Sequence, residues 1–215
     1  MLVAVEGVDG SGKGTQTRLL AEHARAEGIA VRVFSFPRYG DNPFSDAAAR
    51  FLNAEFGDPS PELAALPYAG DRFLARPEID AALADGALVV CDRYVASNMA
   101  HQGARVAGPD RERLLDWIAR VEYGAYALPR PDLTILLDLP VQTAGELVLR
   151  KGARDYTERA QDMLEGDAVH TAAAQEVYRS LVDGSWQVVD AVRDGELRPP
   201  QEIAAEIWDA VRSRL

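Results

Sequence analysis

The chain has 215 residues, 47% of them hydrophobic and 27% charged, which is typical of one globular domain, spanning residues 1–215, with a full-sized core. The net charge of −11 at pH 7 argues against an extended surface for nucleic acid or an anionic membrane, so an anionic ligand would need a local positive site. A single cysteine, Cys91, allows no disulfide within the chain, and the lack of a signal peptide or an apolar run of about 18 residues favours a cytoplasmic enzyme.

Five short apolar runs are predicted to be β-strands. Because they are apolar without alternation, we expect parallel strands that are buried on both faces. The runs are Leu2–Val5, Ala30–Phe34, Ala87–Cys91, Leu133–Leu137 and Trp186–Val189. Longer segments between and after them are compatible with helices, at 13–27, 61–84, 110–122, 141–150, 162–182 and 200–214.

This alternation of strands and helices predicts an α/β fold of three layers. We expect a five-stranded parallel sheet with helices on both faces, and ligands at the carboxyl ends of the strands. Pro67 and Pro77 fall inside the segment 61–84 and predict a kink or a break in its helix.

A glycine-rich segment after the first strand, GVDGSGKGT, nearly matches the phosphate-binding pattern G-x-x-x-x-G-K-[ST]. Its glycines let the backbone N–H groups turn toward phosphate oxygens, the following helix adds its N-terminal dipole, and Lys13 supplies a cation for the β- and γ-phosphates. The alternative is a glycine-rich turn beside an exposed lysine. The residues expected to bind ATP here are Gly7, Val8, Asp9, Gly10, Ser11, Gly12, Lys13, Gly14 and Thr15.

Two positions depart from the pattern. Gly14 stands where a hydroxyl residue is expected, so Mg²⁺ would rely on waters, phosphate oxygens and acids elsewhere. Asp9 would repel a triphosphate if it pointed into the loop, so we expect it to point across to a second site and to meet a sugar hydroxyl or a metal-bound water. The alternative is a turn residue that caps local N–H groups.

Aromatic residues and arginines cluster in three later segments, FPRYG at 36–40, YAGDR at 68–72 and DRY at 92–94. All three are expected on the ligand-binding side of the sheet, where they offer aromatic faces for a base and guanidinium groups for a phosphate. Taken singly, each has a structural alternative, a core aromatic or a structural ion pair.

In order and spacing, GVDGSGKGTQ, FPRYG, YAGDR and DRYVASNMAHQG resemble the bacterial thymidylate kinases, a family with the P-loop NTPase fold, most of all the actinobacterial kind. The resemblance runs from residue 1 to about residue 180, and adenylate and guanylate kinases lack its DRYxxSxxA-aromatic-QG pattern. It implies transfer of the γ-phosphoryl group of ATP to dTMP, giving dTDP, with Mg²⁺ as cofactor, and usually a homodimer.

The resemblance also implies roles for individual residues. Asp9 would face the 3′-hydroxyl of dTMP or a magnesium-bound water, Tyr68 would stack on thymine, and Arg72 would reach its O4. Arg93 would clamp the acceptor phosphate, and Asp92 would lie near magnesium. The base and sugar slot would be lined by Ser97, Asn98 and Gln102, with Phe36 and Tyr39 as the opposite wall.

His101 departs from the family, which usually has Tyr or Phe at this position beside the sugar's 2′-carbon. An imidazole is smaller and polar, and near neutral pH it can gain or lose a proton, so it would exclude a 2′-hydroxyl less strictly. The alternative is that His101 only packs against its helix.

The resemblance identifies a mobile lid at about 150–165, within a segment 150–167 that is basic first and acidic later. The alternative is a solvated helix end. The resemblance implies a transition-state arginine in either the phosphate loop or the lid. Because loop residues 8–11 carry no positive charge, we expect it in the lid, with Arg159 preferred over Arg154. The resemblance aligns Asp162, with Asp155 as its rival, and Glu165 with acids near magnesium. It makes Arg150 a candidate for stacking on adenine.

Phosphoryl transfer by Lys13, Arg93, Arg159 and Mg²⁺ would need no general base, because a phosphate monoester is already an anionic nucleophile. The alternatives are a different small phosphotransferase, which a screen of acceptors would separate, and a P-loop switch or ATPase module. The last would hydrolyse ATP without an acceptor and leaves the aromatic and arginine residues unexplained.

Overall fold

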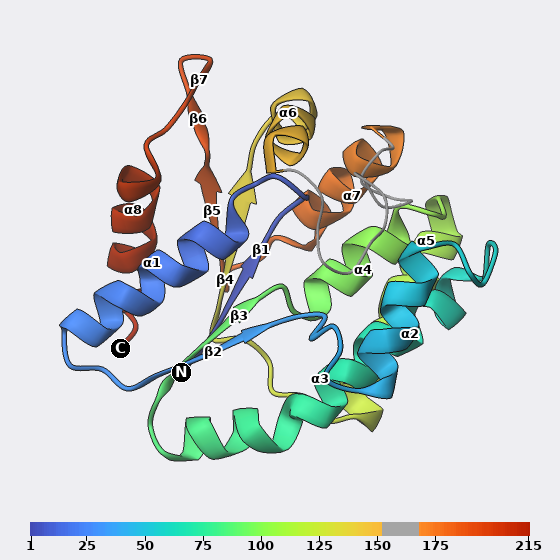
Figure 1. Cartoon of the computed structure of the whole chain (residues 1–215), viewed down its shortest axis with the longest axis horizontal. Coiled ribbons are helices and arrows are strands. Elements are labelled where there is room, and N and C mark those ends of the chain that lie inside the picture. Colours follow the sequence, from blue (N-terminus) through green and yellow to red (C-terminus); the bar gives the residue numbers. More distant parts are fainter. Residues whose placement is uncertain (152–167) are drawn as a thin grey trace.

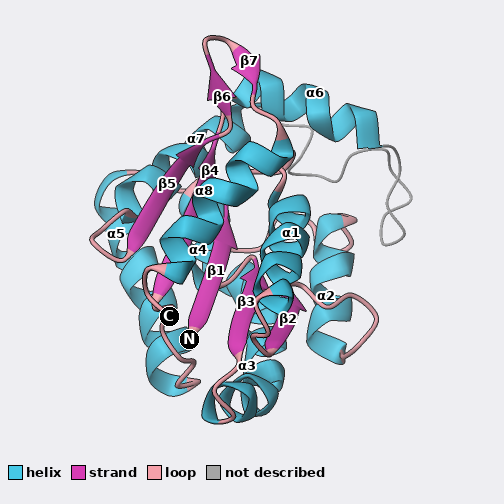
Figure 2. Ribbon diagram, turned by 90° about the vertical axis from the view of Figure 1, so that its left-hand side faces the viewer, coloured by secondary structure: helices cyan, strands magenta, loops and turns pink. Residues whose placement is uncertain are grey.

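A five-stranded parallel sheet lies between two layers of helices (Figures 1 and 2). The computed structural model describes residues 1–151 and 168–215. In the sheet, the strand order is β2-β3-β1-β4-β5, and all five predicted strands are present. Their bounds are β1 Leu2–Glu6, β2 Val31–Ser35, β3 Leu88–Asp92, β4 Leu133–Asp138 and β5 Trp186–Asp190. The predicted three-layer α/β fold is therefore confirmed.

The helices agree with the predicted segments at most positions, with two additions. Neither α2 nor α4 was expected, and a short antiparallel hairpin, β6–β7, follows β5. Part of the predicted helix 162–182, its residues 162–167, lies outside the described residues. The bounds are α1 Lys13–Ala26, α2 Pro43–Leu52, α3 Pro61–Ala84, α4 Val95–Gly103, α5 Gly108–Ala119, the π-helical turn η1 Arg120–Ala125, α6 Val141–Lys151, α7 Ala168–Leu181, α8 Pro200–Arg212, β6 Val192–Arg193 and β7 Glu196–Leu197.

Burial of the strands follows their place in the sheet. The three central strands, β3, β1 and β4, each have neighbours on both sides and are buried almost throughout, as predicted. The expectation is wrong for β2 and β5, which are the two edges, where Val33 and Val188 are 40% and 38% exposed. A short apolar run does not distinguish an edge strand from a central one.

The alternating side chains of β1 enter two different hydrophobic clusters. Val3 and Val5 face the cluster that contains residues of α1 and α8. Leu2 and Ala4 face the cluster that contains residues of α3 and α5. The sheet is thus covered on both faces, and the carboxyl ends of its strands are left for ligands.

Of the kink or break expected at Pro67 and Pro77, the break does not occur, because α3 runs as one helix from Pro61 to Ala84. A proline removes one helical hydrogen bond, but packing of the remaining face can hold the helix together. Ala75 and Ile79, which flank Pro77, are fully buried against the sheet.

The helix α2 begins with a capping box. The side chain of Asn42 accepts hydrogen bonds from the backbone N–H groups of Phe44 and Ser45, and Pro43 occupies the first turn. Phe44 lies directly over Gly70 of α3, where a Cβ atom would collide with the ring. This glycine therefore allows α2 to lie close against α3, beside the ends of β2 and β3 (Figure 1).

No helix in the described part of the chain is long and apolar enough to cross a membrane.

Candidate active site

The glycine-rich loop joins β1 to α1 and is pressed against neighbouring backbone. Gly7 has φ 144°, and a Cβ atom on it would lie 2.7 Å from the carbonyl oxygen of Leu137 in β4. Gly10, with φ 84°, would collide in the same way with the carbonyl group of Ala144 in α6. Both positions require glycine, for the left-handed backbone and for the space. The loop shape predicted for phosphate binding is therefore built into the packing of β1 against β4 and α6.

Lys13 is the first residue of α1, and its ammonium group folds back across the loop. Nζ donates a hydrogen bond to the carbonyl oxygen of Val8 at 2.9 Å, and only 7% of the residue is exposed. Burial, together with the nearby charge of Arg93, lowers the pKa of Lys13 to about 8. The Oγ of Ser11 is buried without a hydrogen-bond partner among the described residues. A phosphate group in this loop would meet the ammonium group of Lys13 and the unused hydroxyl of Ser11.

Asp9 points out of the loop toward the turn between β3 and α4. Its carboxylate forms an ion pair with the guanidinium of Arg93, and Oδ1 lies 3.9 Å from Nζ of Lys13. A carboxylate in an anion-binding loop is therefore tolerated because it is neutralised on the far side by Arg93. The two cations lie on either side of one acid.

Arg93 occupies a strained backbone position that fixes its direction. It has φ 66°, which is uncommon for a residue with a side chain. Burial alone would lower the pKa of this guanidinium, but the carboxylate of Asp9 raises it well above its ordinary value, so the charge persists at any physiological pH. Nη1 donates to Oγ of Ser97 at 3.2 Å and lies 3.3 Å from Nε2 of His101.

Glu6, at the end of β1, lies beneath this cluster and was not predicted. It is fully buried and accepts hydrogen bonds from the backbone N–H groups of Tyr94 and Ser97, at 2.8 and 3.2 Å, and from Oγ of Ser97 at 2.5 Å. The hydroxyl of Tyr178 donates to the same carboxylate at 3.2 Å. Burial raises the pKa of Glu6. The carboxylate ties β1 to the first turn of α4 and to α7, and the only signal in the sequence is an acid that ends an apolar run.

Arg72 is paired with a second buried acid. Its Nε and Nη2 both donate to Glu122 of η1 at 2.6 Å, and Arg72 is 2% exposed. Asn98 joins the pair through Nδ2, 2.8 Å from Glu122, while its Oδ1 is buried without a partner among the described residues. No described residue binds Nη1 of Arg72. This nitrogen and the oxygen of Asn98 are the groups that remain for a ligand.

Substitution of Glu122 by glutamine is expected to destabilise the folded chain by about 3–5 kcal/mol, because the guanidinium of Arg72 would stay buried without a counter-charge. The free energy of unfolding from urea titration measures the loss. The double variant Arg72→Met, Glu122→Gln is the control, since removal of both charges should recover most of the stability. A single variant that loses less than about 1 kcal/mol would mean that water or another group compensates Arg72.

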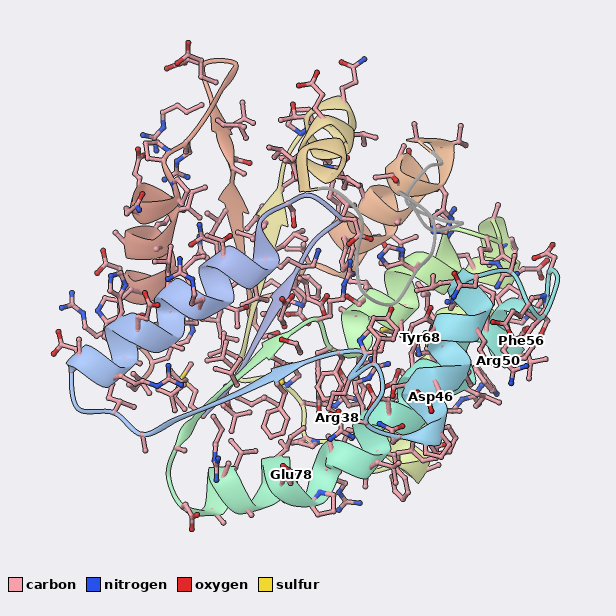
Figure 3. The ribbon with its side chains drawn as sticks, in the orientation of Figure 1. Arg38, Asp46, Arg50, Phe56, Tyr68 and Glu78 are labelled. Carbon is pink, nitrogen blue, oxygen red and sulfur yellow. The ribbon has the colours of Figure 1, made fainter. Side chains whose placement is uncertain are left out.

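The predicted aromatic residues fall into two groups. Phe36 is 4% exposed, with the guanidinium groups of Arg38 and Arg72 5.9 and 6.0 Å from its ring centre. Tyr39 and Tyr68 are partly buried and pack against the cluster formed by Phe51, Leu52 and Ala64. In Figure 3 Arg38 lies between the end of β2 and α3. Phe36 is thus part of the core just after β2, and Tyr68 of α3 packs with Tyr39 against a separate small cluster.

Asp71, in the segment YAGDR, was given no role by the sequence, yet its carboxylate binds the segment that follows β2. It is fully buried, and it accepts the backbone N–H of Arg38 at 2.8 Å, Nε of Arg38 at 2.9 Å and Nδ2 of Asn42 at 2.7 Å. These bonds hold Arg38 and the start of α2 to α3. Gln102 is also buried, and its Oε1 accepts from Arg105 at 3.1 Å.

Asp92 ends β3 and approaches the start of α1. Its Oδ2 lies 3.2 Å from the place that a Cβ atom on Gly14 would occupy. The glycine at position 14 thus leaves Asp92 next to the phosphate loop. The predicted residues Arg159, Asp162 and Glu165, together with the rivals Arg154 and Asp155, lie outside the described residues, as does the side chain of Arg150, whose backbone belongs to α6.

His101 does not titrate near neutral pH, contrary to expectation. Burial and the neighbouring charge of Arg93 lower its pKa to about 3, so the imidazole is neutral. Its ring is stacked on that of His170 from α7, with ring centres 5.7 Å apart, and meets the edge of Tyr178 at 6.3 Å. The side chain therefore joins α4 to α7 beside Arg93.

The sequence and the fold of the chain are both similar to those of known thymidylate kinases. Residues 5–198 match the family model described as "Thymidylate kinase". The chain is 37% identical over 197 residues to a thymidylate kinase of Mycobacterium tuberculosis, covering 89% of this chain and 92% of that protein. It is 33% identical over 220 residues to one of Rhodopseudomonas palustris, with 99% and 89% covered. The solved structure of thymidylate kinase from Candida albicans shares the fold, with a TM-score of 0.79 at 22% identity over 99% of this chain and 91% of that one.

Proposed function

The chain belongs to the thymidylate kinase family and phosphorylates dTMP to dTDP with ATP as donor, and we propose that Lys13 and Arg93 hold the two reacting phosphates. The observation that carries this assignment is the placement of the two cations on either side of Asp9, one in the loop and one outside it. The triphosphate of ATP occupies the glycine-rich loop. The monophosphate of the acceptor binds beside Arg93.

The chemistry of this arrangement is alignment and charge neutralisation. An acceptor monoester is already an anionic nucleophile, so no general base is assigned. Lys13 neutralises the β- and γ-phosphates, and Arg93 brings the acceptor oxygen toward the γ-phosphorus while Asp9 keeps the guanidinium in place. Arg159, from the segment proposed as the lid, adds positive charge to the phosphoryl group in transit, with Arg154 as the alternative. Arg150 is proposed to stack on adenine.

The nucleoside of dTMP is proposed to lie between the aromatic groups and α4. Tyr68 stacks on thymine, and Phe36 and Tyr39 form the opposite wall. Arg72 reaches the base through Nη1, because Nε and Nη2 are held by Glu122. The slot is completed by Asn98, whose buried Oδ1 needs a donor, and by Ser97, His101 and Gln102.

Mg²⁺ is proposed as the cofactor, since transfer between phosphates in this family generally uses it. This ion keeps several waters and takes one or two carboxylates together with phosphate oxygens. Asp92, beside Gly14 at the loop, fits that need, and Asp9 can hold a metal-bound water. Asp162 and Glu165 are the further candidates. The ion would neutralise charge on the β- and γ-phosphates.

A scan of acceptors tests this assignment. With ATP and Mg²⁺, release of ADP is expected to be fastest with dTMP and slower with dUMP, since a single methyl group contributes about 1–3 kcal/mol of discrimination. The other acceptors to be compared are the ribose form of TMP, AMP, CMP, GMP and unphosphorylated thymidine. Preference for AMP or thymidine would refute the assignment of the acceptor site, and ADP release without any acceptor would indicate an ATPase.

We also propose that the enzyme is a cytoplasmic homodimer. The family resemblance suggests the dimer, and four apolar side chains on α2 and α3 are candidates for its interface. Phe44, Leu63, Phe73 and Leu74 are 38%, 59%, 40% and 43% exposed. Sedimentation equilibrium measures the mass in solution.

A further inference from the structure

Arg93 is held on three sides by neighbouring groups. Its Nη2 contacts Asp9, and its Nη1 contacts Oγ of Ser97 at 3.2 Å and Nε2 of His101 at 3.3 Å. A guanidinium has five N–H groups, two of them on Nη1. Ser97 and His101 together therefore use both N–H groups of Nη1. No described residue binds Nε, and Asp9 takes one of the two N–H groups of Nη2, so the N–H of Nε and the second N–H of Nη2 remain for a ligand.

The contact with Nη1 determines the protonation state of His101. A guanidinium has no acceptor atom, so the hydrogen bond requires a lone pair on Nε2. A neutral imidazole with an unprotonated Nε2 carries its proton on Nδ1. The lowered pKa of His101, caused by burial and then by the charge of Arg93, agrees with a neutral ring. The charged groups that face it are Arg93, Asp9 and Lys13, with His170 and Tyr178 from α7 as the titratable neighbours.

The ring has little freedom to turn away from Arg93. Ser97 and His101 lie four residues apart on α4 and so share one face of this helix, and Arg93, which precedes the helix, contacts both of them. His170 stacks on the imidazole with an angle of 28° between the planes, and Tyr178 meets it edge-on at 89°. The two rings of α7 thus pack against the imidazole and hold its Nε2 toward Nη1.

We propose that His101 is a positioning residue for Arg93: its neutral Nδ1–H tautomer accepts a hydrogen bond from Nη1 and aims the Nε–Nη2 edge of the guanidinium at the acceptor phosphate. This edge is the planar fork that a phosphate can accept from with two oxygens. The inference rests on the proposed role of Arg93 at the acceptor phosphate. It differs from a filter for deoxyribose, because the effect passes through Arg93 and is the same for every acceptor monophosphate.

Two substitutions of His101 distinguish its role as a hydrogen-bond acceptor for Arg93 from a role in packing alone. His101→Gln keeps an oxygen acceptor at about the reach of Nε2 but loses the aromatic ring. His101→Phe keeps a ring between His170 and Tyr178 but has no acceptor. We expect His101→Phe to lower kcat/KM for dTMP on the order of tenfold and His101→Gln to retain most of it, since a hydrogen bond to a charged group is lost only in the first. The control is His23→Phe, on α1, which packs against Trp208 and should leave kcat/KM unchanged.

The ratio of kcat/KM between dTMP and the ribose form of TMP supplies a second readout. We expect this ratio to stay the same in both His101 variants. If His101→Phe were the more active of the two, or if the ratio changed while kcat/KM for dTMP did not, the positioning role would be wrong.

The tautomer can be measured without substrate. In ¹⁵N spectra of the imidazoles, the signals that His101→Phe removes belong to His101. Between pH 6 and 8 we expect a proton on Nδ1 and none on Nε2, because Nη1 of Arg93 donates to Nε2. A proton on Nε2 would overturn the inference, whatever the enzyme phosphorylates. Unchanged dTMP turnover in an Arg93 variant would instead overturn the proposed role of Arg93, so the two failures are distinguishable.

Discussion

Replacement of Arg93 by methionine is expected to lower kcat/KM for dTMP by on the order of 10³, because one preorganised donor to transferring phosphoryl groups contributes about that much. The affinity for ATP should fall less, because Gly7 and Gly10 still shape the loop and Lys13 stays near Asp9, although Asp9 loses its ion pair with Arg93. Steady-state kinetics with dTMP, together with ATP binding by calorimetry, measure both quantities.

Arg93→Lys is the informative companion. An ammonium keeps the positive charge beside Asp9 but cannot present a planar fork, so the lysine variant should recover only a small part of the lost rate. Arg212→Met, at the exposed end of α8, removes an arginine paired with Asp209 and should leave kinetics unchanged. Equal losses of dTMP turnover and ATP affinity in Arg93→Met would place the arginine at the donor nucleotide instead.

Replacement of Arg159 by alanine is expected to lower kcat by on the order of 10³ with a small change in the KM for dTMP, because an arginine that contacts only the transition state leaves ground-state binding intact. The reason lies in the loop, where residues 8–11, Val-Asp-Gly-Ser, carry no positive charge for the γ-phosphate. Steady-state kcat and KM separate these two effects.

Arg154→Ala is the matched variant from the same segment and should have the smaller effect. If kcat stays unchanged in Arg159→Ala and falls in Arg154→Ala, the transition-state role belongs to Arg154. If neither variant loses activity, Arg150 is the remaining candidate, and failure there would remove the proposed function of this segment altogether.

The strands and most of the helices could be predicted because buried backbone favours continuous apolar runs and amphipathic periodicity. The helix α4 was not predicted because its buried face includes the polar residues Ser97, Asn98 and Gln102, which contact charged groups. These residues interrupt the apolar periodicity that marks an amphipathic helix. The helix α2 carried a start signal, Asn42-Pro43 followed by Ser45, that pattern reading could have found.

The loop and the arginines of the site could be identified from short motifs, but their partners could not. Glu6 binds Tyr178, 172 positions away, and Arg72 binds Glu122, 50 positions away. Local sequence patterns do not predict such buried pairs between distant residues, because a single acidic residue in a sequence is usually exposed. The neutral state of His101 likewise depends on burial and on Arg93, which only the folded structure supplies.

Because Gly7 packs against Leu137 of β4, the glycine-rich loop can fold only late during synthesis of the chain. The glycine-rich loop follows β1, whose residues Leu2 and Val3 pair with Val89 of β3 and Leu133 of β4. A ribosome that adds about 5–20 residues per second completes these neighbours seconds after β1. Because distant pairing must wait for the intervening chain, the loop acquires its shape only after β4 has left the ribosome. ATP can therefore stabilise the finished or nearly finished chain, and gives no support to a nascent one that ends before Asp138.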